Sequence, residues 1–253
     1  MKNKFKLRSL SLLIVAASGL AACGGGGVDL PFGDLRVVNA ISDSSSLDAQ
    51  AVNLPSDINN IAVNTASGFR TVPDSSFNLN LTVNTASSPL GFNFDNVDID
   101  NDVETSVYLP GKVVDGSYDT NGFQVKNGRA GIGTGMAEIQ PVHAASNLPV
   151  AISLYLNPPA DPTFSGTPIT VDYKTGAVPS AIASGSYRLR VTATGSPVIL
   201  FDSGPTGVTI AADARLQIAA LNKTDATGAA LGIALLLIPS DNSTAVAVPN
   251  VLP

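Results

Sequence analysis

Three residue types that often carry protein chemistry are nearly missing from this chain. Its 253 residues include one cysteine, one histidine and no tryptophan. A single cysteine excludes a disulfide within the chain, so the core must hold by packing alone. It also excludes a zinc site built from a cluster of histidines and cysteines. The lack of tryptophan removes the side chain that most often provides an apolar platform for sugars.

Basic residues are also scarce. The chain has 14 lysines and arginines against 20 acidic residues, and four of the basic ones precede residue 23. From residue 23 onward, 10 basic residues therefore face 20 acidic ones, a formal charge of −10. Nucleic acids and anionic lipid headgroups are excluded as expected partners, because both require clustered lysine and arginine.

Long apolar runs are absent beyond Val28. The most apolar stretch, Leu231 to Ile238, has eight residues, whereas a spanning helix needs roughly 20. This run therefore predicts a fully buried central strand.

The N-terminus has the layout of a secretory signal peptide. A basic start precedes an apolar run from Leu10 to Val15, and small residues lead to the sequence Leu20-Ala21-Ala22-Cys23. This ending resembles a bacterial lipobox. The resemblance implies cleavage of residues 1–22 and acylation of Cys23 on its thiol and its new amine. The alternatives are an ordinary signal peptide with an incidental cysteine, or an uncleaved anchor.

Lipidation would hold the protein on a membrane without a spanning helix, since two or more acyl chains anchor stably. Gly24 follows the cysteine, and no aspartate stands there. By resemblance to enterobacterial sorting, this favours the outer membrane. Residues 23–34 are expected to form a glycine-rich tether between the lipid and the folded part.

The rest of the chain is an internal repeat of about 100 residues. The offset between matched segments changes only from 104 to 111 residues. The matches are Val38–Ser42 with Val142–Ser146, Ile61–Asn64 with Ile169–Asp172, Phe77–Thr82 with Tyr187–Thr192, and Val97–Asp100 with Val208–Ala211. We therefore expect one domain over 35–130, a glycine-rich linker over 131–136 and a second domain over 137–240. Residues 241–253 are a loose end or a terminal edge strand.

Each copy has the periodicity of β-strands. In Phe77–Val83, apolar residues alternate with Asn78, Asn80 and Thr82, which is typical of an antiparallel sheet with one buried face. Roughly seven short strands per copy are expected. The predicted fold is all-β: two tandem immunoglobulin-like antiparallel β-sandwiches after a cleaved lipoprotein signal peptide.

Two segments carry a family resemblance. Leu35–Ala40 and Val142–Val150 are similar to the start of a bacterial repeat family whose later strand matches Gly185–Val191. The family is labelled domain of unknown function 4397, and its members are typically exported or lipid-anchored. It carries no established catalytic residues, so the resemblance implies fold and location only. The family's proline is missing after Ser42, and Gln140 replaces its arginine in the second copy.

An acidic cluster is the one candidate metal site. Asp98, Asp100 and Asp102 alternate along the chain, and calcium binds carboxylates spaced in this way. The position where an EF-hand needs glycine is Val103. The alternative is a charged strand face or edge that deters pairing with another chain.

No catalytic site is expected. His143 is the only histidine, and its counterpart in the first copy is Asn39. A triad requires a base beside a nucleophile, and no glycine-x-serine-x-glycine elbow is present. A structural role for His143 is favoured over a catalytic one, and no cofactor is expected.

The sequence therefore predicts a lipid-anchored, non-enzymatic envelope protein that acts as a structural, adhesion or binding module. The alternative is a lipoprotein that binds a ligand or glycan, with or without calcium. The expected partners are the membrane, through the lipid, and envelope proteins or surface glycans. The location is the outer membrane, with the folded part facing the periplasm or the cell surface.

Overall fold

The computed structural model is built from β-strands. It describes residues 31–85, 88–113, 122–129, 131–163, 166–224 and 230–252, so the predicted signal peptide and Cys23 lie outside the described residues. Twenty strands and no helix are found in these ranges. The all-β prediction with two tandem immunoglobulin-like sandwiches is confirmed, and Pro31–Pro253 forms one compact unit.

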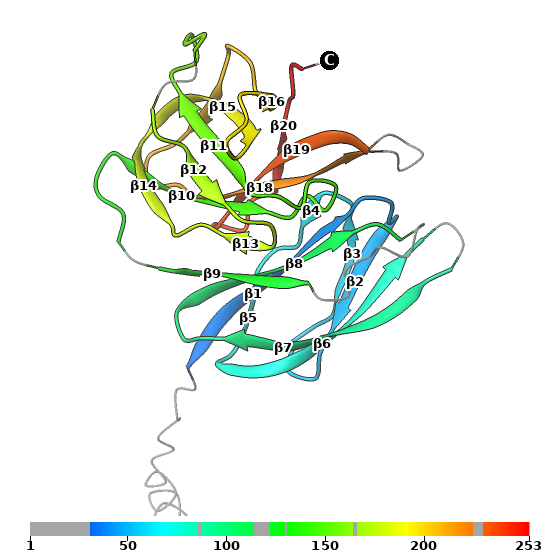
Figure 1. Ribbon diagram of the computed structural model, residues 1–253. Helices are drawn as coiled ribbons and strands as arrows, with labels where there is room; N and C mark the ends of the chain where they lie inside the picture. The colour runs from blue at the N-terminus through cyan, green and yellow to red at the C-terminus, as the bar shows by residue number, and fades with distance from the viewer. Residues whose placement is uncertain are drawn as a thin grey trace, which may run out of the picture. The chain divides into compact units, whose positions relative to one another are not determined.

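Repeat 1 contains two sheets (Figure 1). Sheet A has the order β4-β1-β8-β9, with β5 also paired to β1, and sheet B has the order β3-β2-β6-β7. The pairs are antiparallel except for β1 with β8. The strands are β1 Phe32–Ile41, β2 Ser46–Gln50, β3 Ile58–Ala62, β4 Thr65–Ala66, β5 Arg70–Pro73, β6 Ser75–Asn84, β7 Leu90–Ile99, β8 Val103–Gly111 and β9 Phe123–Gly128.

Repeat 2 has the same plan with two further strands. Sheet C has the order β13-β10-β18-β19-β20, with β14 on β10, and sheet D has the order β12-β11-β15-β16, with β17 on β15. The strands are β10 Met136–His143, β11 Ile152–Asn157, β12 Ile169–Val171, β13 Thr175–Gly176, β14 Ser180–Ala183, β15 Gly185–Ala193, β16 Ile199–Asp202, β17 Val208–Ile210, β18 Arg215–Thr224, β19 Ala230–Pro239 and β20 Val246–Val248.

Each repeat has its own hydrophobic core. In repeat 1 the core lies between sheets A and B and includes Val37, Leu79 and Val107. In repeat 2 it lies between sheets C and D and includes Leu189 and Ile218. Because the inward residues alternate with outward ones along these strands, each sheet presents one face to its core.

A third core joins the two repeats along what we call the seam. It combines residues of sheet A with residues of sheet C, namely Val38, Ala40, Tyr108, Phe123 and Val125 with Val142, Ala144, Ala219, Leu221, Leu236 and Ile238. Sheets A and C are thus buried on both faces. This explains why β1 is almost continuously buried and lacks a polar face.

The apolar run near the C-terminus is a central strand as predicted, but it is not fully buried, because Leu231 is 54% exposed. β19 lies between β18 and β20, and Leu235 and Leu236 point into different cores. β20 forms the edge of sheet C within the segment 241–253. No described segment forms a helix long and apolar enough to cross a membrane.

The repeat equivalence holds in the structure with one correction. Thr65 pairs with Asn39 as Thr175 pairs with His143, so Asn64 is equivalent to Lys174. Both residues have positive φ, 54° and 60°, and their N–H groups donate to the equivalent carbonyls of Asn39 and His143. The sequence match of Ile61–Asn64 with Ile169–Asp172 was therefore wrong by two residues. It followed side-chain similarity, whereas the turn fixes the register.

Candidate functional site

The acidic cluster converges on a lysine. Lys126 of β9 places its Nζ 2.6 Å from Oδ2 of Asp98 and 2.8 Å from Oδ2 of Asp100. The N–H of Asp98 also donates to Oε1 of Gln124 at 3.1 Å. Side chains of β9 thus bind the outer edge of β7, where sheets A and B of repeat 1 meet.

The lysine contacts shift the protonation equilibria of this group. The hydrogen bond from Lys126 and that from Ser76 lower the pKa of Asp98. Burial lowers the pKa of Lys126, but hydrogen bonds and charges from the two aspartates outweigh it and raise the pKa overall. Among the described residues, no group of three or more histidines, cysteines, aspartates or glutamates could hold a metal ion. An ammonium group contacts both carboxylates, and the calcium hypothesis stays an untested prediction.

Asp102 has a different role from its two neighbours. Its φ is 57°, and its N–H donates to the carbonyl of Phe32 at 3.0 Å. Asp213 has φ 62°, and its N–H donates to the equivalent carbonyl of Met136 at 2.7 Å. Aspartate tolerates left-handed backbone better than most residues. The aspartate shared by the two copies therefore marks a turn.

His143 is buried and tied to the loop that follows β10. Its Nε2 lies 2.9 Å from the carbonyl oxygen of Leu148 and 3.0 Å from that of Val150, while Nδ1 accepts the N–H of Ala145 at 3.4 Å. Two acceptors at Nε2 and a donor at Nδ1 define the neutral ring protonated on Nε2. Burial lowers the pKa of His143 below its ordinary value, although the hydrogen bonds with the carbonyls of Val150 and Leu148 oppose this change.

Asn39 occupies the equivalent position in repeat 1 and shares one of these contacts. Its Nδ2 donates to the carbonyl of Ile61 at 2.9 Å and to Oγ of Ser44 at 3.0 Å, and its Oδ1 accepts the N–H of Ile41 at 3.2 Å. Ile41 is equivalent to Ala145, so both side chains accept from the residue two positions on. This shared geometry gives His143 a structural role.

A chain of buried polar groups crosses the seam. The Tyr108 hydroxyl donates to Oε1 of Gln217 at 2.8 Å, and Nε2 of Gln217 donates to Oε1 of Gln140 at 3.1 Å. Nε2 of Gln140 then donates to the carbonyl of Lys126 at 3.0 Å. Burial raises the pKa of Tyr108 above its usual range. Since buried polar groups must find partners, this chain restricts how the sheets can pack.

Arg36 lies at the same seam and is 2% exposed. Its Nη1 donates to the carbonyl of Pro239 at 2.8 Å, and its guanidinium carbon lies 3.7 Å from the ring centroid of Phe69. Burial lowers the pKa of Arg36 to about 10, against the attraction of Tyr108, Glu104 and Asp241. A cation–π contact is strongest in such a desolvated site.

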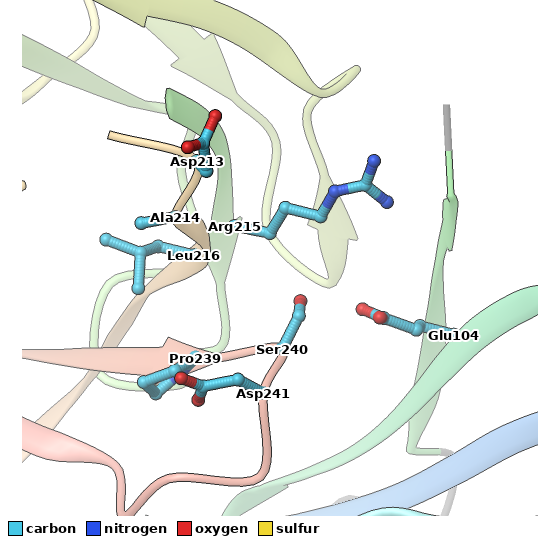
Figure 2. A pocket seen from close by; sticks show the side chains of 8 residues that line it. All are labelled: Glu104, Asp213, Ala214, Arg215, Leu216, Pro239, Ser240 and Asp241. Carbon is cyan, nitrogen blue, oxygen red and sulfur yellow. The ribbon is translucent and has the colours of Figure 1, made fainter. Parts of the chain in front are cut away.

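A cavity of about 250 Å³ opens beside these residues. Figure 2 shows the side chains of Glu104, Arg215 and Ser240 directed toward a shared space. Residues of repeat 2 form most of the wall, and Glu104 is the contribution of repeat 1. The lining consists of Glu104, Asp213, Ala214, Arg215, Leu216, Pro239, Ser240 and Asp241.

The charged groups around this cavity compensate one another. Oε1 of Glu104 lies 3.5 Å from Nε of Arg129, and Oε1 of Glu138 lies 3.9 Å from Nε of Arg215. Arg129 also pairs with Asp34. Burial raises the pKa of Glu104, although the hydrogen bond with Ser240 and the nearby arginines oppose this rise. The cavity is thus part of the ionic packing of the seam.

A second charged cluster lies on the outer face of sheet D. Arg188 binds Asp202 in a bidentate manner, with both nitrogen–oxygen distances at 2.7 Å. Arg190 is 1% exposed and donates to the carbonyls of Asp161 at 2.6 Å and Thr163 at 2.7 Å. Although burial raises the pKa of Asp202, the bonds from Arg188 and Gly204 and both arginine charges lower it overall. The two arginines therefore hold segment 158–163 on this face.

The sequence identified Asp98, Asp100 and His143, but it did not predict that Arg36, Glu104 and Arg190 are buried. Arginines at alternate positions of a strand, as in Tyr187–Thr192, look like a solvated face. One signal for the burial of Arg190 was available in the sequence. The segment that follows β11 is longer than the equivalent segment after β2, so it can cover the sheet face. Cys23, the candidate lipidation site, lies outside the described residues.

No family model matches the chain, and no curated protein matches it significantly.

Proposed function

We propose that this chain is a lipid-anchored, non-enzymatic protein of the bacterial cell envelope that serves as a structural or adhesion module. The observation that carries the proposal is the sequence Leu20-Ala21-Ala22-Cys23 after a basic and then apolar start. Acylation of Cys23 would fix the protein at the outer membrane, with repeats of the domain of unknown function 4397 type beyond a short tether.

The seam supports a structural or adhesive role. Sheets A and C share an apolar core and a buried polar chain, so the two sandwiches are held as one body. A rigid body on a lipid anchor can present loops and sheet faces at a fixed geometry to envelope proteins or glycans. The buried His143, whose nitrogens are bound to loop backbone, favours a role without catalysis.

Protease accessibility on intact cells tests the proposal, with Cys23→Ala as the matched variant. We expect wild type to remain with the membrane fraction and Cys23→Ala to be released. Digestion on intact cells would support adhesion at the surface, and protection until the outer membrane is opened would support a periplasmic structural role. Identical membrane association of both proteins would refute the lipid anchor.

A glycan-binding lipoprotein is the second candidate function, because one sheet face of repeat 1 is open and rich in amides. A calcium requirement is a separate proposal for Asp98, Asp100 and Asp102. It predicts that calcium raises the thermal midpoint of wild type but not of Asp98→Asn/Asp100→Asn. Equal midpoints of wild type with calcium and with chelator would exclude it.

A further inference from the structure

The outer face of sheet B carries a row of amide side chains. Gln50, Asn80 and Asn93 lie side by side on β2, β6 and β7, since Gln50 pairs with Asn80 and Asn80 pairs with Asn93. All three are exposed. Gln50 donates to Oδ2 of Asp57 at 3.0 Å, whereas the side chains of Asn80 and Asn93 bond to no other described residue.

The residue types on this face are poor strand formers. Asparagine and aspartate are depleted in strands, where threonine and the β-branched residues fit better. Yet the exposed positions of the face are almost all of these types, namely Gln50, Asn59, Asn60, Ser76, Asn78, Asn80, Asn93, Asp95 and Asn96. Asn60 and Asn96 have positive φ, which asparagine tolerates, and Asn78 accepts the N–H of Asn96, so these three have structural roles. The side chains of Asn80 and Asn93 have no such role, and a departure from local preference without a structural gain is expected at functional surfaces.

In repeat 2 the equivalent row is covered by a segment of the chain itself, residues 158–163. Tyr155, Arg190 and Asp202 occupy the positions of Gln50, Asn80 and Asn93, with the same cross-strand pairing. There Arg190 binds the carbonyls of segment 158–163 and is buried by the contact. The same sheet position therefore supports a polymer chain in one repeat and is open to solvent in the other.

The chemistry of the open face selects the occupant. Among its described residues, strands β2, β3, β6 and β7 carry no large exposed apolar side chain of the kind that forms the centre of a protein interface. Asp48, Asp57 and Asp95 lie on or beside it, which disfavours anionic polymers. Each amide offers two donors and an acceptor oxygen, which matches the hydroxyl groups of a sugar. Neighbouring strands lie about 4.8 Å apart, comparable with the length of one pyranose ring in an extended chain.

From this geometry we infer that the outer face of sheet B binds an extended, uncharged polysaccharide through the amide row Gln50, Asn80 and Asn93. The inference rests on the proposed envelope function, because it names the class of partner for that module. Without an aromatic platform each sugar contributes little, so affinity depends on contact with several residues of the polymer.

Electrophoresis in native gels that contain a polysaccharide tests the inference with the full chain in mild detergent. The probes are dextran and the β-glucan laminarin as uncharged polymers, alginate as an anionic one and polylysine as a cationic one. We expect an uncharged glucan to retard wild type and alginate not to do so. In Asn80→Thr/Asn93→Thr the apparent affinity should fall by about tenfold, since two hydrogen-bonding groups are lost.

The variants keep the test independent of folding. Threonine favours strands, so Asn80→Thr/Asn93→Thr should fold at least as stably as wild type. Ser186→Ala/Thr209→Ala, an exposed cross-strand pair in repeat 2, is the matched control and should retain retardation. In wild type, the side-chain NH₂ resonances of Asn80 and Asn93 should shift with glucan.

Three results would overturn the inference: no retardation by either glucan, equal retardation of Asn80→Thr/Asn93→Thr, or retardation by polylysine alone. The anchor test separates this failure from failure of the proposed function. Cys23-dependent membrane association without glucan binding removes only the sheet B site. Glucan binding without Cys23-dependent association removes the lipoprotein and leaves the site.

Discussion

Repeat 1 and repeat 2 share one strand plan but use it differently at the outer face of their second sheet. In repeat 1 this face exposes Asn80, whereas in repeat 2 the equivalent Arg190 is buried under segment 158–163. Along β1 and β10, by contrast, Asn39 and His143 differ in chemistry, yet both accept the N–H of the residue two positions on.

The comparison separates two kinds of position. Where a backbone N–H two positions along the chain needs an acceptor, either asparagine or neutral histidine meets the need. Where a sheet face meets solvent, the fold places no demand, so the two repeats diverged. Divergence at the open face is thus more informative about function than the shared loop contacts.

The largest effect is expected from removing the buried arginine of repeat 2. Arg190→Ala should lower the free energy of unfolding by about 3 kcal/mol or more, because it leaves Asp202 with one arginine and removes the hydrogen bonds from Arg190 to the carbonyls of Asp161 and Thr163. Urea denaturation measures this loss. The equivalent Asn80→Ala should change stability by no more than about 0.5 kcal/mol. Equal losses in the two variants would contradict the assigned difference between the faces.

A smaller effect should follow from breaking the polar chain at the seam. Tyr108→Phe leaves Oε1 of Gln217 without its donor, and burial without a partner costs about 1–2 kcal/mol. Tyr187→Phe is the control, since its hydroxyl donates to a carbonyl at an exposed site, and should cost less than about 0.5 kcal/mol. Calorimetry of both should show a single transition, because the repeats share a core. Two separate transitions in wild type would show that the seam does not couple them.

Exchanging the loop-holding residue should change the pH dependence. Burial lowers the pKa of His143 in the folded protein below the ordinary value of 6.5. The unfolded chain therefore binds a proton more readily, and wild type should lose stability as pH falls below about 6.5, by at most about 1.4 kcal/mol per pH unit. His143→Asn, which copies repeat 1, should lose less over that window in denaturation at pH 7 and pH 5.5. Parallel curves for the two proteins would refute the buried neutral ring.

The smallest effect concerns Glu104 at the seam cavity. Burial raises the pKa of Glu104 in the folded state, so the fold disfavours the charged carboxylate. The buried charge therefore lowers the free energy of unfolding at pH values above that pKa. Glu104→Gln should therefore be as stable as wild type or more stable at pH 7, by less than about 1 kcal/mol. The advantage should shrink as pH falls toward 4.5, the ordinary value for a glutamate. If Glu104→Gln were clearly less stable than wild type at pH 7, the ion pair with Arg129 would stabilise the fold by more than burial of the Glu104 charge destabilises it.

Much of the fold could be predicted from periodicity. Alternation along Phe77–Val83 identified β6 and its buried face, and the spacing of matched segments revealed the repeat. The match around Ile61 failed because similar side chains recur every two residues in a strand, so sequence similarity does not fix register there. The turn at Asn64 and Lys174 does, through positive φ and a backbone hydrogen bond.

The candidate sites were less predictable. Asp98 and Asp100 were noticed as a pair, but Lys126 comes from a strand 26 to 28 residues away. Glu104 lies near Arg129 because β8 pairs with β9, and it lines the same cavity as Arg215 only because sheets A and C pack face to face. Charged residues along a strand look alike in sequence whether they meet solvent or a neighbouring sheet.

The sequence by itself determined an all-β chain of two related copies, because strand periodicity and turn residues act over a few positions. Tertiary structure alone decided which polar residues are buried. Arg190 lies in a strand whose local pattern resembles that of Asn78 and Asn80, yet it is covered by a loop, and Arg36 is covered by contacts with repeat 2. Burial depends on what packs against a face, and that is set by contacts between residues far apart in the chain.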